Sequence, residues 1–452
     1  MKAGAAIGGA TLWRCLAGLG YLLALAACLR AQQPAPVLQP VEQKLPSLTV
    51  GNVIAYALQN NPGLAVKRHE RGIASARVVI ANTYPFNPVS ENRIQAAFTP
   101  NDPASTTFNA PVENLITWEV EVRQQRRIRK EMAAASLTRT EWEIAFEEQT
   151  VAIQVIRAFY NVVYRQQKLE LLEKTLRVNQ RLVEDVERLI KTGKLRLPDK
   201  IVAQIEVSNT QDQLASGHEA LTAAWQDLYR AMGPVGGFEI MGHLELPPLA
   251  WNPAELCDLA VTRRADVNAR RLAISEASAK TRLTVANRFG NPVVGPAFAY
   301  DNTNTVWIGV QVNVPLPFPN THKGEILESQ AEQAQAAAQL RQAEVTAMQD
   351  VAAALSRIEK AQQTLELLRT QTLPARQQAF DDMERLFQAG EPGLDILKVI
   401  DVRRQLLLGQ GAYLDALLSV RQARADLLAA TGEPVLDLCA PEQLPAPPLP
   451  KP

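Results

Sequence analysis

The feature that most constrains this fold is a long stretch, Gln124 to Thr192, that contains neither proline nor glycine. These two residues destabilise a helix interior more than any others. Apolar residues recur along the stretch at alternating spacings of four and three, the heptad pattern of a coiled coil. They are Ile144, Val151, Val155, Ala158, Val162, Leu169, Leu172, Leu176, Val183, Val186 and Ile190, interrupted by Glu148, Arg165 and Asn179. At 1.5 Å per residue such a helix spans about 100 Å. The sequence therefore predicts an elongated, mainly α-helical protein.

The second half of the chain carries a shorter copy of this pattern, at Ala347, Val351, Ala354, Ile358, Ala361, Leu365 and Leu368. Pro374 follows, and proline removes a helical hydrogen bond, so we expect a bend or local break there. Each long helix ends at a turn that contains glycine, at 193–198 and 390–393, because glycine suits the end of a helix. A returning helix follows each turn, at about 199–232 and 394–431. The chain is thus predicted to form two long antiparallel helical hairpins, with coiled-coil packing.

The two hairpins belong to an internal duplication. Residues 57–64 align with residues 260–267, and residues 189–193 align with residues 386–390. Asn87-Pro88 corresponds to Asn291-Pro292 after a small gap. Self-similarity of this kind indicates repeated structural units. The predicted domains are two repeats, 48–232 and 256–432, joined by a glycine- and proline-rich linker at 233–255, with proline-rich segments at 28–47 and 433–452.

Two other segments, Ile116–Arg123 and Ile308–Val314, alternate apolar with polar or small residues. Less regular partners precede them, at about 93–98 and 294–300. A period of two is how a transmembrane β-strand separates lipid from lumen, and about eight residues approach the length of a tilted span. Four transmembrane strands per chain are therefore predicted. The alternative is an amphipathic hairpin packed on a soluble core.

Four strands cannot close a barrel. In lipid, an open sheet edge leaves backbone donors and acceptors unpaired, at several kcal/mol each. Copies of the chain must therefore share one sheet. On that sheet Thr117, Glu119 and Glu121 would face the water of the lumen, and rings of them would bias the passage of cations. They can equally be ordinary residues of a wet face.

The first 27 residues form a targeting segment. Its apolar run, 15–27, is shorter than the about 20 residues that a membrane span needs. The run ends in Leu25-Ala26-Ala27-Cys28, which resembles a bacterial lipobox, so Cys28 is the predicted site of lipidation. An ordinary signal peptide is the alternative. Either leader takes the mature chain out of the cytoplasm, where Cys257 and Cys439 can form a disulfide.

Charge and motif content argue against several functions. The chain balances 47 basic against 47 acidic residues, so no net field attracts nucleic acid. The basic run at 126–130 is assigned a surface or salt-bridge role. The four histidines, His69, His218, His243 and His322, have no partners at zinc-ligand spacing. No phosphate-binding loop or nucleophile elbow is present. We therefore predict no enzyme activity, no cofactor and no bound metal.

The opening Ala57-Leu58-x-x-Asn61-Pro62-x-Leu64, its looser second copy and the paired hairpin strands resemble the TolC-like outer-membrane efflux protein family. The resemblance covers about residues 48–432. It implies a homotrimer with a shared twelve-stranded β-barrel in the outer membrane and a helical tunnel across the periplasm. Two local features, at 122–129 and at 314–324, resemble the heavy-metal cation efflux branch.

The same resemblance implies a passive channel in a tripartite efflux or type I secretion system. Its partners would be a periplasmic adaptor, an inner-membrane pump of the resistance-nodulation-division or ABC type, and outer-membrane lipid. Asp395 matches the acidic gate position of the family, and Lys398 stands where a second acid is often found. The pair would form the periplasmic gate, or a solvated turn. A soluble periplasmic coiled-coil adaptor and an exported enzyme subunit are the rival interpretations.

Overall fold

The computed structural model describes residues 45–95, 111–234, 236–246, 252–301, 303, 305–316, 318, 320–389 and 396–432. Apart from Leu45, these residues belong to one compact unit that starts at Pro46. Among them, no helix carries a segment both apolar enough and long enough to cross a bilayer.

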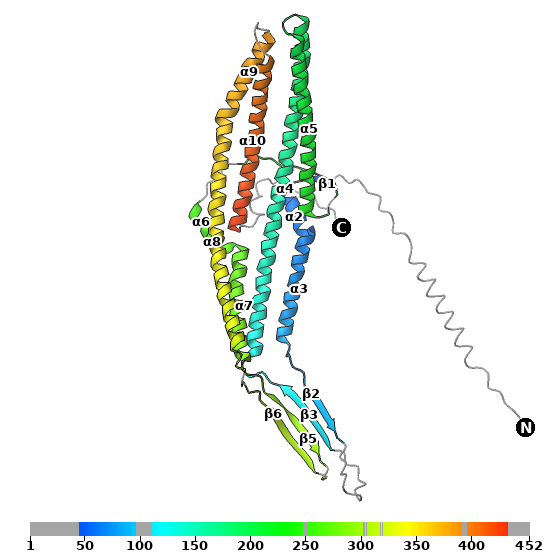
Figure 1. Ribbon diagram of the computed structural model, residues 1–452, viewed down its shortest axis with the longest axis vertical. Helices are drawn as coiled ribbons and strands as arrows, with labels where there is room; N and C mark the ends of the chain where they lie inside the picture. Colours follow the sequence, from blue (N-terminus) through cyan, green and yellow to red (C-terminus); the bar gives the residue numbers. More distant parts are fainter. Residues whose placement is uncertain are drawn as a thin grey trace, which may run out of the picture. The chain divides into compact units, whose positions relative to one another are not determined.

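The element order repeats, as the duplication predicts (Figure 1). The first repeat contains α2 (Val50–Asn60), α3 (Pro62–Asn82), β2 (Val89–Ile94), β3 (Val112–Glu119), α4 (Gln125–Lys191) and α5 (Leu197–Met232). The second contains α6 (Pro253–Arg263), α7 (Ala265–Asn287), β5 (Val293–Tyr300), β6 (Val306–Asn313), α8 (Lys323–Leu367), α9 (Leu373–Ala389) and α10 (Ile396–Thr431). Two short strands, β1 (Leu45–Leu48) and β4 (Phe238–Ile240), pair separately. The predicted mainly helical fold with a small β part is confirmed.

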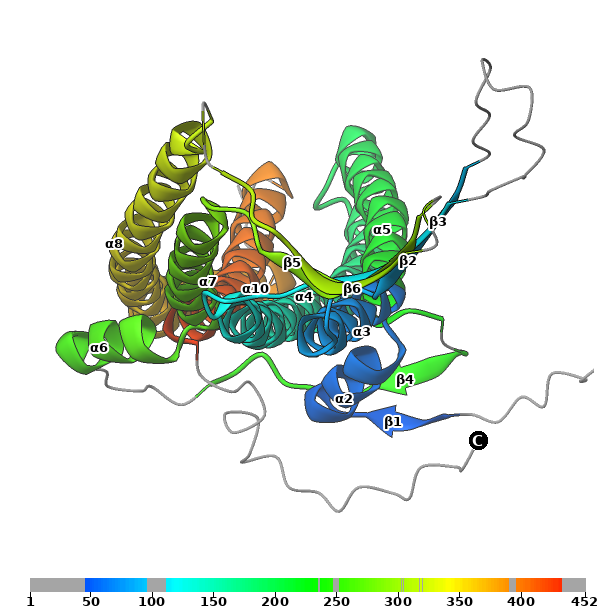
Figure 2. The same ribbon diagram turned by 90° about the horizontal axis from the view of Figure 1, so that it is seen from below.

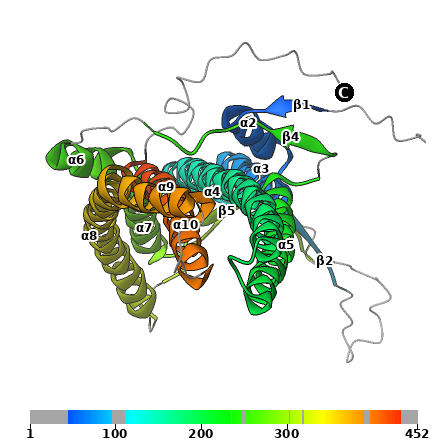
Figure 3. The same cartoon turned by 90° about the horizontal axis from the view of Figure 1, so that it is seen from above.

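The 67-residue helix α4 is the longest element of the structure. Five of its eleven heptad residues, Ile144, Val151, Val155, Val162 and Val186, are buried, and the other six are half-buried. Ile144 is 2% exposed, and Val155 and Val162 are fully buried. Helices α3, α5, α7 and α10 pack along α4. Seen from above, α4 and α5 form one hairpin, and α9 and α10 form the other (Figure 3).

Two of the three polar interruptions of the heptad pattern, Asn179 and Glu148, have side-chain hydrogen-bond partners, whereas the buried Nε of Arg165 has none among the described residues. Buried Asn179 donates a hydrogen bond from Nδ2 to Thr210 Oγ1 of α5, at 2.9 Å. Glu148 accepts from Arg68 of α3, at 2.7 Å. These residues therefore link α4 to its neighbours at places where an unpaired polar group would cost free energy.

The long helix of the second repeat is interrupted before Pro374, as expected. Residues Leu368–Thr372 form a π-helical segment between α8 and α9. The missing N–H of Pro374 and the bulk of its ring are incompatible with a regular α-helical turn at residue 370. A π-helical turn accommodates this defect without ending the helix.

Both repeats contain a joint at which one helix stops and the next begins. Asn61 separates α2 from α3, with φ −67° and ψ 119°. Arg264 separates α6 from α7, with nearly the same angles, −56° and 129°. In each repeat the returning helix ends at a glycine beside the joint: a Cβ on Gly233 would lie 2.7 Å from Asn60 O, and a Cβ on Gly432 would lie 2.9 Å from Arg264 Cα. The repeat thus extends to the backbone geometry of the joints.

The four longer strands form one antiparallel sheet in the order β2-β3-β5-β6, drawn as a curved band in Figure 2. The predicted strand pairs are present, but β3 begins earlier and ends earlier than its alternating pattern suggested. The alternation continues to Arg123, whereas the backbone leaves the sheet after Glu119. The strand ends there because residues that follow it make contacts with α4.

Candidate membrane sheet and channel wall

The sheet has one strongly apolar face that is open in the single chain. The register aligns Phe298 with Ile308 and Val294 with Val312, so their side chains point the same way. Ile308 is 84% exposed and Val310 is 75% exposed. An apolar surface of this kind needs a partner of its own polarity. Its apolar members are Ile94, Val112, Ile116, Trp118, Val294, Pro296, Phe298, Val306, Ile308, Val310 and Val312, and Ser90, Asn92 and Asn114 are polar exceptions on β2 and β3.

The opposite face carries mainly small and polar residues. Thr117 and Glu119 of β3 lie on it together with Gly295 and Ala297 of β5 and Gln311 of β6. Gly295 is required there, because a Cβ would lie 1.7 Å from the carbonyl oxygen of Ile116 on the neighbouring strand. The structure therefore brings two of the three predicted lumen residues onto one face; their role in a lumen stays a prediction.

Glu121 does not follow that prediction. It lies beyond the end of β3, and its side chain is only 4% exposed. Its carboxylate accepts hydrogen bonds from both terminal nitrogens of Arg129, in the first turns of α4. The expectation that Glu121 faces water from the strand is wrong for this chain, because its carboxylate is buried in an ion pair with Arg129 of α4.

A polar network that sequence reasoning missed holds the sheet to the helices. Fully buried Gln125 donates to Asn291 Oδ1, and Asn291 donates from Nδ2 to Glu119 at 2.9 Å. The hydroxyl of Tyr84 donates to Glu119 O at 2.7 Å and accepts from Glu121 N at 3.1 Å. The repeated Asn-Pro at 87–88 and 291–292 was the available signal for this network.

Both outer strands of the sheet are open along one side. Within the described residues, β2 pairs only with β3, and β6 pairs only with β5. Every residue of β6 is exposed. Since each of the three pairings is antiparallel, β2 and β6 run in opposite directions. The protein therefore presents two complementary, unpaired edges.

At the other end of the hairpins, a small apolar cluster joins the two repeats. It contains Leu182, Val186, Ala203, Phe387, Ile396, Val399 and Ile400. Lys398 is exposed on the first turn of α10, next to buried Val399. Its predicted gate partner, Asp395, lies outside the described residues, so the gate pair stays a prediction.

Consecutive arginines of α10 extend this link toward the middle of the hairpins. The side chain of Arg403 is 11% exposed and lies 3.5 Å from Glu384 of α9. It also donates to the carbonyl of Val178 on α4, at 3.5 Å. Burial lowers the pKa of Arg403, against the opposing effect of Glu384 and Asp185. Sequence reasoning missed this residue, because heptad patterns do not reveal which arginines are buried.

Arg404 points elsewhere, and donates to Glu206 of α5 at 2.6 Å. This hydrogen bond raises the pKa of Arg404. Two neighbouring cations of one helix thus reach both helices of the other hairpin.

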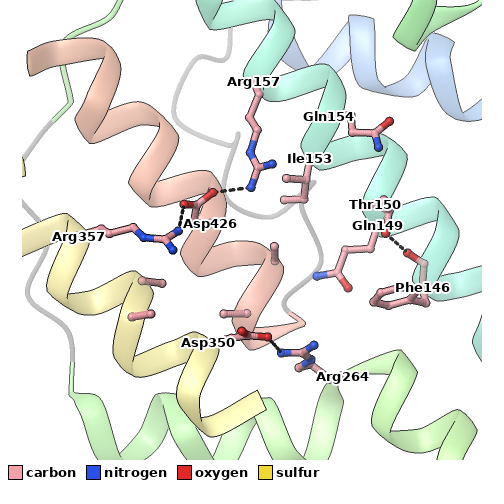
Figure 4. Close-up of a pocket in the computed structure, with 14 residues that line it drawn as sticks. Phe146, Gln149, Thr150, Ile153, Gln154, Arg157, Arg264, Asp350, Arg357 and Asp426 are labelled. Carbon is pink, nitrogen blue, oxygen red and sulfur yellow. Dashed lines mark hydrogen bonds and ion pairs between the residues drawn. The ribbon is translucent and has the colours of Figure 1, made fainter. Parts of the chain in front are cut away.

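A cavity of about 310 Å³ lies between α4, α8 and α10 beside the joint at Arg264 (Figure 4). Asp426 of α10 accepts from Arg157 of α4 and from Arg357 of α8, the latter at 2.7 Å. Arg264 pairs with Asp350 at 2.8 Å. Each of the three arginines that line this cavity pairs with a carboxylate, and Arg157 and Arg357 share one, so these ion pairs join α4, α8 and α10 and the joint.

The remaining predicted residues are isolated or lie outside the described part. Cys28 and Cys439 fall outside it, and Cys257 is half-buried on α6. The disulfide and the lipid anchor therefore stay predictions. Within the described ranges, no three residues among His, Cys, Asp and Glu converge as a metal site would require.

Comparison with known proteins places this geometry in a family. The model of the family described as outer membrane efflux protein matches residues 53–234 and 256–433. The cobalt-zinc-cadmium resistance protein CzcC of Cupriavidus metallidurans is 22% identical over 384 residues, covering 83% of this chain and 88% of that protein.

Two solved structures share the fold. CusC superposes with a TM-score of 0.71 at 17% identity, covering 85% of this chain and 92% of that chain. The outer membrane protein VceC of Vibrio cholerae superposes with a TM-score of 0.68 at 17% identity, covering 85% of this chain and 96% of that chain. Because the family match spans both repeats, the chain belongs to the outer membrane efflux protein family and is an efflux channel protein of the outer membrane.

Proposed function

We propose that three copies of this chain close a twelve-stranded barrel in the outer membrane and form the exit channel of a tripartite efflux system. The observation that carries this proposal is the open sheet with one apolar face and two antiparallel edges. Pairing β6 of one copy with β2 of the next satisfies both edges, which lipid requires. Three copies give twelve strands, an even number within the range of outer-membrane barrels.

The proposed cargo is divalent metal cations. CzcC is named for resistance to cobalt, zinc and cadmium, and its similarity extends over most of both chains. The face that would line the barrel carries Glu119 and Gln311 but no described arginine other than Arg93, which is ion-paired with Glu113. Carboxylates that face a lumen favour cations. The chain itself would act as a passive conduit without enzyme activity.

Energy for transport would come from partners. We assign an inner-membrane pump of the resistance-nodulation-division type and a periplasmic adaptor, which would contact the helix tips near Lys398. Asp395 and Lys398 would form the closed periplasmic gate between neighbouring copies. Cys28 would carry the lipid anchor in the outer membrane, and Cys257 would pair with Cys439 on the periplasmic side.

Two neighbouring residues of β6 test the barrel directly. Val310→Lys places a charge on the lipid face, at a cost of about 2–4 kcal/mol near the bilayer midplane. Gln311→Lys, the matched control, places the same charge on the opposite face. We expect the first variant to lose the heat-sensitive trimer on electrophoresis of outer membranes, and the control to keep it. Equal assembly of both variants would contradict the assigned faces.

The cargo needs a separate measurement in cells. A deletion strain should become sensitive to cobalt, zinc and cadmium, and the wild-type gene should restore growth where Val310→Lys does not. Sensitivity confined to dyes and antibiotics would remove metal cations as the cargo while leaving the channel intact.

A further inference from the structure

The junction between the sheet and the helices is strongly cationic. We define it as residues 83–88, 120–130, 288–292 and 314–323, which are the four connections together with the first residues of α4 and α8. These residues include seven lysines and arginines and one acid, Glu121. The whole chain balances 47 basic against 47 acidic residues. The excess positive charge is therefore local, and it includes the basic run at 126–130 that the channel function leaves unexplained.

Several of these cations have no carboxylate partner among the described residues. Arg123 donates to the carbonyl oxygens of Phe289 and Gly290, and Arg126 donates to the carbonyl of Asn82 at 2.8 Å. Arg288 is exposed, and its described contact is with the ring of Phe289. Carbonyl and ring contacts orient a guanidinium without neutralising it. In contrast, Arg129 is fully paired by Glu121.

Two of the uncompensated arginines converge on one aromatic ring. The guanidinium carbon of Arg123 lies 5.0 Å from the centroid of the Phe289 ring, and that of Arg288 lies 5.4 Å from it. Phe289 itself is 37% exposed. Both guanidinium groups therefore lie against an exposed ring at the surface, where each can accept an anionic partner. Arginine is well suited to hold a phosphate there, because its fork of donors matches phosphate oxygens.

An exposed apolar segment lies directly beside this pair. Leu316 is 80% exposed and Phe318 is 89% exposed. The segment contacts the arginine-bearing loop, since a Cβ on Gly290 would lie 2.7 Å from Pro315 Cγ. Val314 and Leu316 continue the alternation of Val310 and Val312, the apolar face of β6. Aromatic and apolar groups followed by cations are the order found where a protein crosses from acyl chains to headgroups.

We propose that this junction binds the phosphate of an anionic phospholipid headgroup, with Arg123 and Arg288 as the ligands and Leu316 and Phe318 in the acyl boundary. The proposal rests on the proposed function, since it requires the sheet to lie in a membrane. Cationic side chains at a membrane surface attract anionic lipids, and the attraction weakens as salt rises.

Native mass spectrometry of the detergent-solubilised, full-length protein tests this. The protein is incubated with equal amounts of dioleoylphosphatidylglycerol and dioleoylphosphatidylcholine, and the retained lipids are counted. Wild-type protein should retain the anionic lipid preferentially, less so as salt is raised. Arg288→Gln should lower that preference on the order of fivefold, and Arg123→Gln/Arg288→Gln should lower it further. A thermal midpoint near that of wild type verifies that each variant is folded; Arg288→Gln, which removes no described hydrogen bond, carries the test if the double variant unfolds.

The matched control is Arg188→Gln/Arg385→Gln, which removes two exposed arginines from α4 and α9 that have their own aspartate partners. It should leave the preference unchanged. An unchanged preference in Arg288→Gln, or an equal loss in the control, overturns the proposal. So does competition by inorganic phosphate at the concentration of the lipid, which would identify a free-phosphate site. A protein that never enters bilayers would instead defeat the proposed function, and insertion without lipid preference would defeat this inference alone.

Discussion

The two joints of the duplicated fold have nearly the same backbone angles but different chemistry. At the first joint, Asn61 accepts a hydrogen bond from Leu64 N at 3.0 Å and donates to Ala231 O at 2.8 Å. At the second joint, Arg264 pairs with Asp266 and with Asp350, each at 2.8 Å. The first joint is closed by a neutral amide, whereas the second depends on a buried cation.

The charged joint also contacts the long helix of its repeat. Asp350 belongs to α8, so Arg264 ties the joint to the long helix of its repeat. Burial alone would lower the pKa of Arg264, but its hydrogen bonds to Asp266 and Asp350 outweigh burial and raise it. The comparison teaches that the duplication preserved a backbone geometry while the side chains that stabilise it diverged.

One arginine contact, in contrast, is the same in both repeats. Seven residues after each joint stands an arginine that donates to the carbonyl three residues before the joint: Arg68 to Leu58 O at 2.6 Å, and Arg271 to Val261 O at 2.9 Å. Each also faces a glutamate of its long helix, Glu148 and Glu344 respectively. This arrangement is therefore a feature of the repeat rather than of either copy.

The largest expected effect comes from removing the buried cation. Arg264→Ala leaves two carboxylates without their partner, so we expect the free energy of unfolding to fall by about 3 kcal/mol or more. Asn61→Ala, which removes a helix cap and one hydrogen bond, should cost about 1–2 kcal/mol. Urea unfolding of the detergent-solubilised protein measures both. Equal losses would show that charge makes no difference between the joints. Arg264→Asn should recover part of the loss, because it supplies the capping residue of the first joint.

The glycine that ends α5 tests how tightly the first joint is packed. Gly233→Ala combines a positive φ of 93° with a Cβ 2.7 Å from the carbonyl oxygen of Asn60, and should cost about 2–3 kcal/mol. Gly193→Ala is the control, since φ is 77° there but nothing lies within 4 Å of the new Cβ. That variant should lose about 1 kcal/mol. Equal decreases in the two thermal midpoints would show that the close approach between residue 233 and Asn60 does not affect stability.

The smallest effect concerns the repeated arginines. Arg68 lies 2.7 Å from Glu148, whereas Arg271 lies 3.6 Å from Glu344, and all four side chains are partly exposed. Double-mutant cycles with alanine should give a coupling of about 0.5 kcal/mol in the first repeat and less in the second. A larger coupling in the second repeat would reverse the order that the distances imply. High salt should reduce both couplings.

Much of the fold was predictable from local patterns. The stretch without proline or glycine, Gln124 to Thr192, predicted α4 within one residue at each end, because a long run of helix formers leaves the chain few alternatives. Pro374 predicted the interruption of the second long helix. Alternation located the strands but misplaced the end of β3, because the pattern continues through residues that have already left the sheet.

Less of the candidate site was predictable. Thr117 and Glu119 lie on the expected face of the sheet, because successive side chains of a strand point alternately to its two faces. The burial of Glu121 depends on Arg129 of the following helix, and that of Arg403 on Glu384 and Val178 of two other helices. Each of these pairings joins two different elements, so the periodicity within one element does not predict it.

The sequence by itself determined the long helices, the duplication and the apolar face of the strands, because each follows from periodicity within one segment. Tertiary structure decided which charges are neutralised. It paired Arg264 with Asp350 across 86 residues, and left Arg123 and Arg288 on the ring of Phe289 without a described carboxylate. The physical reason is that charge pairing acts over a few ångströms in space, and only the packed helices bring such residues within that range.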